Sequence, residues 1–310
     1  MRFLVVGAGA IGGYFGGRLL EAGRDVTFLV RPGRAAQLAA TGLVIRSRYG
    51  DATLPSPPVV LADQLSKPFD VVLLSLKAYD LEQAIASFAP AVGSATAILP
   101  LLNGLSHLDR LAARFGGEHV LGGQCFISAA LDPAGAVLHL NESHALSFGE
   151  RDGRMSDRVR GIAAAMAGAR FDVRATDQIL LEMWEKWVFI ASLAGITCLM
   201  RATVGDIVAA GGADLALGLL GECAAVAQAA GCAPRPESTE RSRGLLSAAG
   251  SPLAASMLRD VERGAPTEAA HILGDLLRRR GAVAGSDRSL LRLAYAQLAA
   301  YEARRVREAV

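Results

Sequence analysis

The sequence has little of what marks disulfide-rich, nucleic-acid-binding or secreted proteins. Only four of its 310 residues are cysteine, and no two of them form a CxxC pair, so we expect reduced structural thiols and no metal site. The formal net charge is only +2, which indicates neither a nucleic-acid nor an acidic partner. The first residues show no secretory signal pattern, and a cytoplasmic location is therefore expected.

Long apolar runs are also scarce. One of them, residues 187–200, contains Gly195 and lies between Lys186 and Arg201. A membrane-spanning helix needs roughly 20 consecutive apolar residues. Because this run is shorter, it predicts a buried helix, and we expect no membrane segment.

What is present is a clear alternation of strand and helix patterns in the first half of the chain. Hydrophobic residues make up 52% and charged residues 20%, and the length suits two domains. Short apolar runs predict strands at 3–6, 25–30, 69–76 and 95–99, with helices over 11–22, 81–88 and 106–115. This order predicts a Rossmann-type, doubly wound parallel sheet.

The remaining patterns divide the chain in two. Residues 42–60 resemble an irregular hairpin insertion, and the β-rich region 120–149 is expected to extend the same sheet with antiparallel strands. A helix over 154–168 and a last strand over 171–174 follow. Beyond Thr176 the pattern is helical, with breaks at 211–212, 231–236 and 281–287. We therefore predict a Rossmann domain over 1–176 and an all-helical domain over 177–310.

The segment "VVGAGAIGG" carries the first functional motif. Gly7, Gly9 and Gly12 form a GxGxxG pattern directly after a predicted strand and at the head of a predicted helix. Such glycines allow a tight turn, let a pyrophosphate approach the backbone, and let helix and strand pack closely. The helix start at Ala10 and Ile11 would offer free N–H groups to the phosphates. A dinucleotide site is favoured over a merely structural turn.

The end of the second predicted strand, "TFLVRPGR", bears on the choice of cofactor. NAD-binding proteins usually have an acidic residue here, which accepts hydrogen bonds from the ribose hydroxyls. This chain has Arg31, with Arg34 close by, and arginine suits a 2′-phosphate. The pattern favours NADP(H), the alternative being a solvated loop arginine.

Three further polar residues are candidates for a cleft. Lys77 and Asn103 follow successive predicted parallel strands, at the edge where ligands bind in such sheets. Lys186 opens the apolar run of the helical region. From spacing alone, Lys186 is equally well explained as a lysine that extends from a helix end and pairs with Glu182.

Together these segments resemble the ketopantoate reductase (2-dehydropantoate 2-reductase) family over essentially the whole chain. The matching pieces are "GAGAIGG", Arg31, "SLKAYD", "NG" at 103–104, "WEKW" around Lys186 and "SMLRDVERGAPTE" at 256–268. The resemblance implies a Rossmann domain, a helical domain and a cleft in which NADPH reduces a 2-keto acid.

The resemblance also implies roles for individual residues. Lys186 corresponds to the general acid that protonates the substrate carbonyl oxygen, a step for which an ammonium group is suited. Glu268 corresponds to an acidic residue that orients the site beside the cofactor, and Ser256 to the serine that holds the substrate carboxylate. Lys77 and Asn103 correspond to residues near both nicotinamide and substrate. Without the family, Glu268 and Ser256 would be read as surface residues.

Four positions depart from the family pattern, which has asparagine where this chain has Ile190, Ala194, Val204 and Leu253. A site that lacks these amides cannot hydrogen-bond a polar hydroxy acid in the same way. Three functions therefore stay open: reduction of 2-dehydropantoate to (R)-pantoate in pantothenate biosynthesis, reduction of a less polar carbonyl compound, or non-catalytic NADP(H) binding. The apolar stretch 213–230 suits either a helical core or a homodimer interface.

Overall fold

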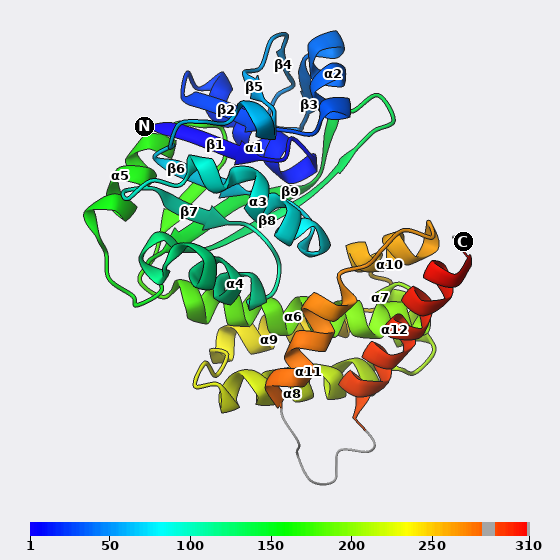
Figure 1. Cartoon of the computed structure of the whole chain (residues 1–310). Helices are drawn as coiled ribbons and strands as arrows, with labels where there is room; N and C mark the ends of the chain where they lie inside the picture. Colours follow the sequence, from blue (N-terminus) through cyan, green and yellow to red (C-terminus); the bar gives the residue numbers. More distant parts are fainter. Residues whose placement is uncertain (281–288, 309–310) are drawn as a thin grey trace. The chain divides into compact units, whose positions relative to one another are not determined.

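The computed structural model describes residues 1–280 and 289–308, and its chain forms two compact units (Figure 1). The first unit comprises Met1–Asn103 and His107–Ile179, and the second comprises Gly104–Ser106 and Leu180–Val310. The predicted break at 281–287 lies outside the described residues.

A five-stranded sheet forms the centre of the first unit. Its strands are β1 (Arg2–Val6), β2 (Asp25–Leu29), β5 (Val59–Val60), β6 (Val71–Leu74) and β7 (Ala97–Pro100). They pair in the order β5-β2-β1-β6-β7, all parallel. The buried, nearly all-apolar strands β6 and β7 fit a sheet covered on both faces. The predicted doubly wound fold is confirmed, and its strand order reverses beside β1, where such sheets bind ligands.

Helices and short turns connect these strands. The α-helices of the unit are α1 (Ala10–Glu21), α2 (Pro32–Thr41), α3 (Leu81–Phe88), α4 (Ser106–Phe115), whose first residue Ser106 belongs to the second unit, and α5 (Asp157–Met166). Short 3-10 helices are η1 (Ala62–Gln64), η2 (Ala78–Asp80), η3 (Ala89–Ala91) and η4 (Gly117–His119).

Apart from one bridge between Val120 and Ile98 of β7, the expectation that residues 120–149 extend the first sheet is wrong, because their two strands belong to a second sheet. Its strands are β3 (Leu43–Arg46), β4 (Ala52–Leu54), β8 (Gly122–Leu131), β9 (Val137–Gly149) and β10 (Asp172–Ala175). β8 and β9 form a long antiparallel hairpin, β9 pairs in parallel with β3 and β10, and the predicted hairpin insertion supplies β3 and β4. Strand β9 therefore pairs with a strand, β3, that lies far away in the sequence.

Helix α1 packs against both sheets, since it contacts strands of each. A Cβ at Gly16 would lie 2.6 Å from the Phe28 ring in the first sheet, and one at Gly17 would lie 2.7 Å from Ile45 in the second. Glycines on two faces of α1 thus let both sheets approach its backbone. The helix that follows the glycine motif is held on two sides.

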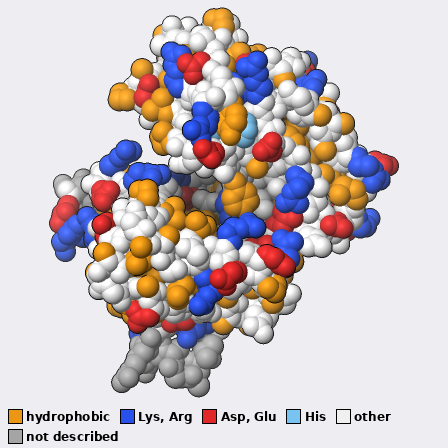
Figure 2. All heavy atoms as spheres, turned by 180° about the vertical axis from the view of Figure 1, so that it is seen from behind, with side chains coloured by type: hydrophobic (Ala, Val, Ile, Leu, Met, Phe, Trp, Pro, Cys, Tyr) orange, Lys and Arg blue, Asp and Glu red, His pale blue; other side chains and the backbone are white. Residues whose placement is uncertain are grey.

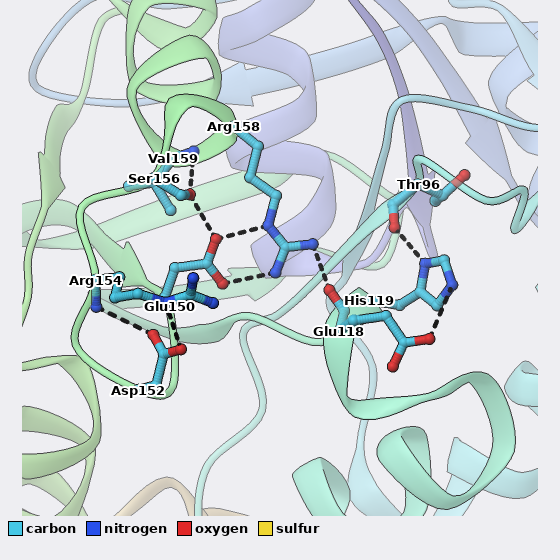
Figure 3. Close-up of polar contacts among 9 residues, drawn as sticks. All are labelled: Thr96, Glu118, His119, Glu150, Asp152, Arg154, Ser156, Arg158 and Val159. Carbon is cyan, nitrogen blue, oxygen red and sulfur yellow. Dashed lines mark hydrogen bonds and ion pairs between the residues drawn. The ribbon is translucent and has the colours of Figure 1, made fainter.

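A buried carboxylate fixes α5 to the end of β9 (Figure 3). Glu150 is 7% exposed, and Arg158 donates to its two oxygens at 2.7 and 2.6 Å. Ser156, the N-cap of α5, donates to Glu150 and accepts from the Val159 N–H. Burial by itself would raise the pKa of Glu150, but these hydrogen bonds and the Arg158 charge outweigh it and hold that pKa below its usual value.

The second unit is built from helices throughout its described part, which confirms the predicted helical region. Its elements are α6 (Ile179–Met200), α7 (Val204–Ala209), α8 (Ala213–Ala229), α9 (Pro236–Leu246), α10 (Ser256–Glu262), the π-helix η5 (Ala270–Gly274), α11 (Asp275–Arg280) and α12 (Leu290–Glu308). Helix α8 packs against α9, α11 and α12. Among the described helices, α6 included, none combines the length and apolarity needed to cross a membrane.

Charge is distributed evenly over the visible surface. Figure 2 shows basic and acidic side chains interspersed on one face of the molecule, with apolar side chains between them. Mixed charge of this kind matches the small formal net charge of +2 and gives no extended patch of one sign on that face.

Candidate active site

The glycine motif sits where β1 ends and α1 begins. Gly7 adopts a φ of 92°, in the left-handed region that favours glycine, and its N–H donates to the Leu29 carbonyl at 2.9 Å. A Cβ at Gly12 would lie 2.1 Å from both the Gly7 carbonyl oxygen and the Ser75 Oγ. Only glycine therefore lets the helix start pack so closely against the strand end.

The same turn leaves room for a phosphate group. A Cβ at Gly9 would meet nothing within 4 Å, and Gly9 precedes α1 without any side-chain cap. The first turn of α1 holds no acidic residue, and Ala10 and Ile11 are partly exposed. Uncapped N–H groups at the positive end of a helix suit the pyrophosphate of a dinucleotide. These residues fit the predicted cofactor.

The two arginines beyond β2 have different surroundings. Arg31 precedes α2, its side chain is 66% exposed, and it donates to Asp80 at 2.7 Å and to Gln83 at 2.8 Å. The Nε of Arg34 instead donates to the Ala8 carbonyl within the glycine turn, at 2.9 Å. Burial lowers the pKa of Arg34, and its Nη2 is buried without a hydrogen-bond partner among the described residues. Arg34, which the sequence marked only as a neighbour, supports the glycine turn directly.

Lys77 and Asn103 lie at one edge of the first sheet. Each follows the last residue of its strand by three positions, and the two strands, β6 and β7, are parallel neighbours. The Lys77 carbonyl accepts the Asp80 N–H at 2.9 Å, which starts η2. Both side chains are partly buried. The structure thus brings these residues to the sheet edge that also carries Gly7.

In the second unit, Lys186 stands in α6 between residues that are firmly held. Glu185 accepts from the Arg235 Nε at 2.8 Å, from its Nη2 at 2.6 Å and from its backbone N–H at 2.9 Å. On the other side, the Trp187 indole donates to the Ile272 carbonyl at 3.0 Å. Lys186 itself is partly buried. Its neighbours therefore fix the rotation of this part of α6.

Glu268 is buried, at 9% exposure, and the residue before it is bound by α12. Glu302 accepts from the Thr267 N–H at 2.6 Å and from its Oγ1 at 2.7 Å, while Arg305 donates to the other Glu302 oxygen at 3.0 Å. Burial alone would raise the pKa of Glu302, but these hydrogen bonds outweigh it and lower that pKa. Glu302 lies 35 positions after Thr267, and no local pattern marks it.

The chain turns into the π-helix η5 directly after this segment. The Glu268 carbonyl accepts the N–H groups of both His271, at 3.0 Å, and Ile272, at 2.9 Å. Short π-helical segments are rare and occur often at functional sites. Ser256 stands apart from this segment as the exposed first residue of α10.

The four departures from the family pattern fall into two groups. Ala194 and Val204 are 3% and 1% exposed and belong to the core. Ile190 and Leu253 are partly exposed, and the Leu253 carbonyl accepts the Val204 N–H at 2.9 Å. Two of the four replacements therefore remove amides from places that are now packed interior.

The cysteines and the groups of potential metal ligands in the described residues give no indication of redox or metal chemistry. The four cysteines are free thiols, and burial raises the pKa of both Cys198 and Cys223 to about 12, which keeps them protonated at neutral pH. Across residues 1–280 and 289–308, no three His, Cys, Asp or Glu side chains are grouped so that they could hold a metal ion.

Comparison with known proteins identifies relatives over almost the full length. The family model "Ketopantoate reductase PanE/ApbA" matches residues 3–153, and its C-terminal counterpart matches residues 178–302. An uncharacterized oxidoreductase of Bacillus subtilis (strain 168), YkpB, is 41% identical over 304 residues, which cover 98% of this chain and 99% of that protein. A 2-dehydropantoate 2-reductase of Mesorhizobium japonicum is 29% identical over 86% of this chain and 88% of its own. The crystal structure of 2-dehydropantoate 2-reductase from Geobacter metallireducens GS-15 superposes with a TM-score of 0.86 at 31% identity, covering 97% and 99% of the two chains.

Proposed function

The chain belongs to the ketopantoate reductase family of oxidoreductases, which use a nicotinamide cofactor, and we propose that it reduces a 2-keto acid to a 2-hydroxy acid with NADPH. The most direct substrate is 2-dehydropantoate, which would yield (R)-pantoate for pantothenate biosynthesis. The observation that carries this proposal is the match to both family regions, which together include the glycine motif, Lys186 and Glu268.

The first unit would bind the cofactor. Gly7, Gly9 and Gly12, with the N–H groups of Ala10 and Ile11, would bind the pyrophosphate at the uncapped start of α1. Arg31, exposed beyond the end of β2, would pair with the 2′-phosphate and so favour NADP(H). Lys77 and Asn103 would line the nicotinamide and substrate region from the sheet edge.

The second unit would supply the proton. When bound, NADPH provides the hydride that adds to C2 of the keto acid. The Lys186 ammonium would stabilise the negative charge that develops on the C2 oxygen and then donate a proton to it, which completes the change from C=O to CH–OH. Glu268 would orient these groups beside the cofactor, and Ser256 would hydrogen-bond the substrate carboxylate.

The experiment that tests this function is a turnover assay. NADPH oxidation is followed by near-ultraviolet absorbance with 2-dehydropantoate and with a panel of bulkier, apolar 2-keto acids. A Lys186→Ala variant should lose about 100-fold or more in kcat, while its Kd for NADPH stays near the wild-type value. Lys67→Ala, which changes an exposed lysine of the first unit, is the matched control and should keep full activity.

A less polar carbonyl substrate is the second candidate, favoured by the partial exposure of Ile190 and Leu253 where the family has amides. Apolar contacts cannot replace hydrogen bonds to a substrate hydroxyl, and this loss changes specificity strongly. Turnover of an apolar keto acid without turnover of 2-dehydropantoate would select this candidate. Cofactor binding without any turnover would instead select the non-catalytic alternative.

A further inference from the structure

The short segment that follows Asn103 makes a specific contact within the second unit. Gly104–Ser106 belongs to that unit, whereas the residues before and after it belong to the first. Ser106 is buried, at 9% exposure, and its Oγ lies 2.8 Å from the Nδ1 of His271. Which atom donates depends on the histidine tautomer. In either tautomer, one hydrogen bond ties this segment to η5.

The same imidazole also covers Gly104. Gly104 has a φ of +78°, and a Cβ on it would lie 3.2 Å from both the Cδ2 and the Nε2 of His271 and 3.3 Å from the His271 carbonyl oxygen. Such distances are below ordinary van der Waals contact. The backbone at Gly104 thus packs directly on the ring whose other side bonds Ser106.

The backbone of His271 is bound to the acidic segment. Its N–H donates to the Glu268 carbonyl at 3.0 Å, and Ile272, the next residue of η5, accepts the Trp187 indole N–H at 3.0 Å. Trp187 is the immediate neighbour of Lys186. One histidine therefore connects the segment after Asn103 with the segment of Glu268, on a π-turn that α6 also contacts.

We propose that His271 is a positioning residue for the reductase reaction, which restrains Asn103 by fixing Gly104–Ser106 on η5. This inference rests on the proposed function, since it assigns a consequence for turnover. The chemistry needs Asn103 in one place, because displacement of a contacting group by about 1 Å can cost about 100-fold in rate. The hydrogen bond and the ring contact together leave the segment little freedom to shift.

The test distinguishes the role of Nδ1 of His271 from that of Nε2. An asparagine side chain places its amide near the position of Nδ1, so His271→Asn can still bond Ser106, whereas glutamine reaches toward the Nε2 position. His271→Ala, His271→Gln and Ser106→Ala should lower kcat/KM for the keto acid by about 10- to 100-fold, and His271→Asn should recover most of that loss. The double variant His271→Ala/Ser106→Ala should be no worse than His271→Ala alone, because the bond that Ser106→Ala removes is already lost in that variant.

A matched control exists in the first unit. Ser47 Oγ and His139 Nδ1 form a bond of the same kind, at 3.0 Å, so His139→Ala measures the effect of losing a serine–histidine bond elsewhere. It should leave kcat/KM unchanged. Hydrogen exchange of the 104–106 amides should rise in His271→Ala and return toward wild type in His271→Asn.

Two results would overturn the inference alone, with the wild type fully active. One is a kcat/KM of His271→Ala within about twofold of wild type, the scatter expected for unrelated sites. The other is an equal loss in the asparagine and glutamine variants, which would indicate a general packing role. A wild-type chain that oxidises NADPH with none of the keto acids would instead overturn the proposed function, and this inference with it.

Discussion

At the start of α1, the helix backbone approaches the end of β1 so closely that position 12 has no room for a side chain. The Gly7 carbonyl and the Ser75 hydroxyl occupy the place of a Cβ on Gly12, whereas the space around Gly9 is open. The two glycines therefore meet different demands. Gly12 is required by the packing of the protein itself, whereas the open space at Gly9 would serve the phosphate group of the proposed cofactor.

This difference predicts a separation of stability from binding. Gly12→Ala should lower the free energy of unfolding by about 1–3 kcal/mol, the usual cost of overpacking, and should weaken NADPH binding as a consequence. Gly9→Ala should leave stability unchanged and weaken NADPH binding alone. Thermal unfolding and fluorescence titration measure the two effects. Equal stability losses in both variants would contradict the assignment.

Arg31 allows a prediction about cofactor choice. Its guanidinium is mostly exposed and forms an ion pair with Asp80. A 2′-phosphate could therefore take the place of the Asp80 carboxylate as its anionic partner. Arg31→Ala should raise the Kd of NADPH by about tenfold, which corresponds to the loss of one hydrogen bond to a charged group. The Kd of NADH should change little. Arg46→Ala, which breaks a similar exposed pair with Asp51, is the control. An equal effect on both cofactors would exclude recognition of the phosphate by Arg31.

At the scale of elements, the segment that carries Glu268 depends on α12 for its hydrogen bonds. Thr267 presents a backbone N–H and a hydroxyl to one oxygen of Glu302, and Tyr301, one position earlier on α12, donates to the Ala265 carbonyl at 2.8 Å. The approach to η5 is thus bonded to a helix that follows much later in the chain. This dependence makes α12 part of the support of the proposed site.

The stabilisation that Glu302 contributes through these hydrogen bonds depends on pH. Because the pKa of Glu302 is lowered in the folded state, its contribution is complete above the ordinary glutamate pKa and is lost as the pH falls through the lowered value. Glu302→Ala should cost about 1–3 kcal/mol at neutral pH, since it leaves two donors without an acceptor. Glu302→Gln should cost less, and its difference from wild type should vanish in acid. Urea unfolding across pH measures this; a difference that grows in acid would contradict it.

At the scale of the whole molecule, homodimer formation stays a prediction, and exposed leucines of the second unit offer a way to test it. Exposed leucines lie on three helices of the second unit, namely Leu215, Leu245 and Leu293. Light scattering after size exclusion should give the mass of two chains, and Leu293→Glu, on α12, should reduce it if that helix lies in the interface. The mass of a single chain for the wild type would show that these leucines are solvated.

The sequence by itself determined the parallel sheet, the glycine turn and the change to helices after residue 176. These features depend on local periodicity and on residues whose backbone freedom or lack of a side chain is unusual, and both can be read over short stretches. The family motifs added the candidates Lys186, Ser256 and Glu268, because a motif preserves the order of residues that act together.

Only the tertiary structure decided which distant segments meet. The second sheet forms because β9 pairs with β3, about ninety positions earlier, at Ile45 and Val137, and no local pattern announces a partner at that distance. Arg34 on the glycine turn, Glu302 at Thr267 and His271 at Ser106 belong to the same class. Each is an ordinary polar residue in sequence, and its role arises from a contact that exists only once the chain has folded.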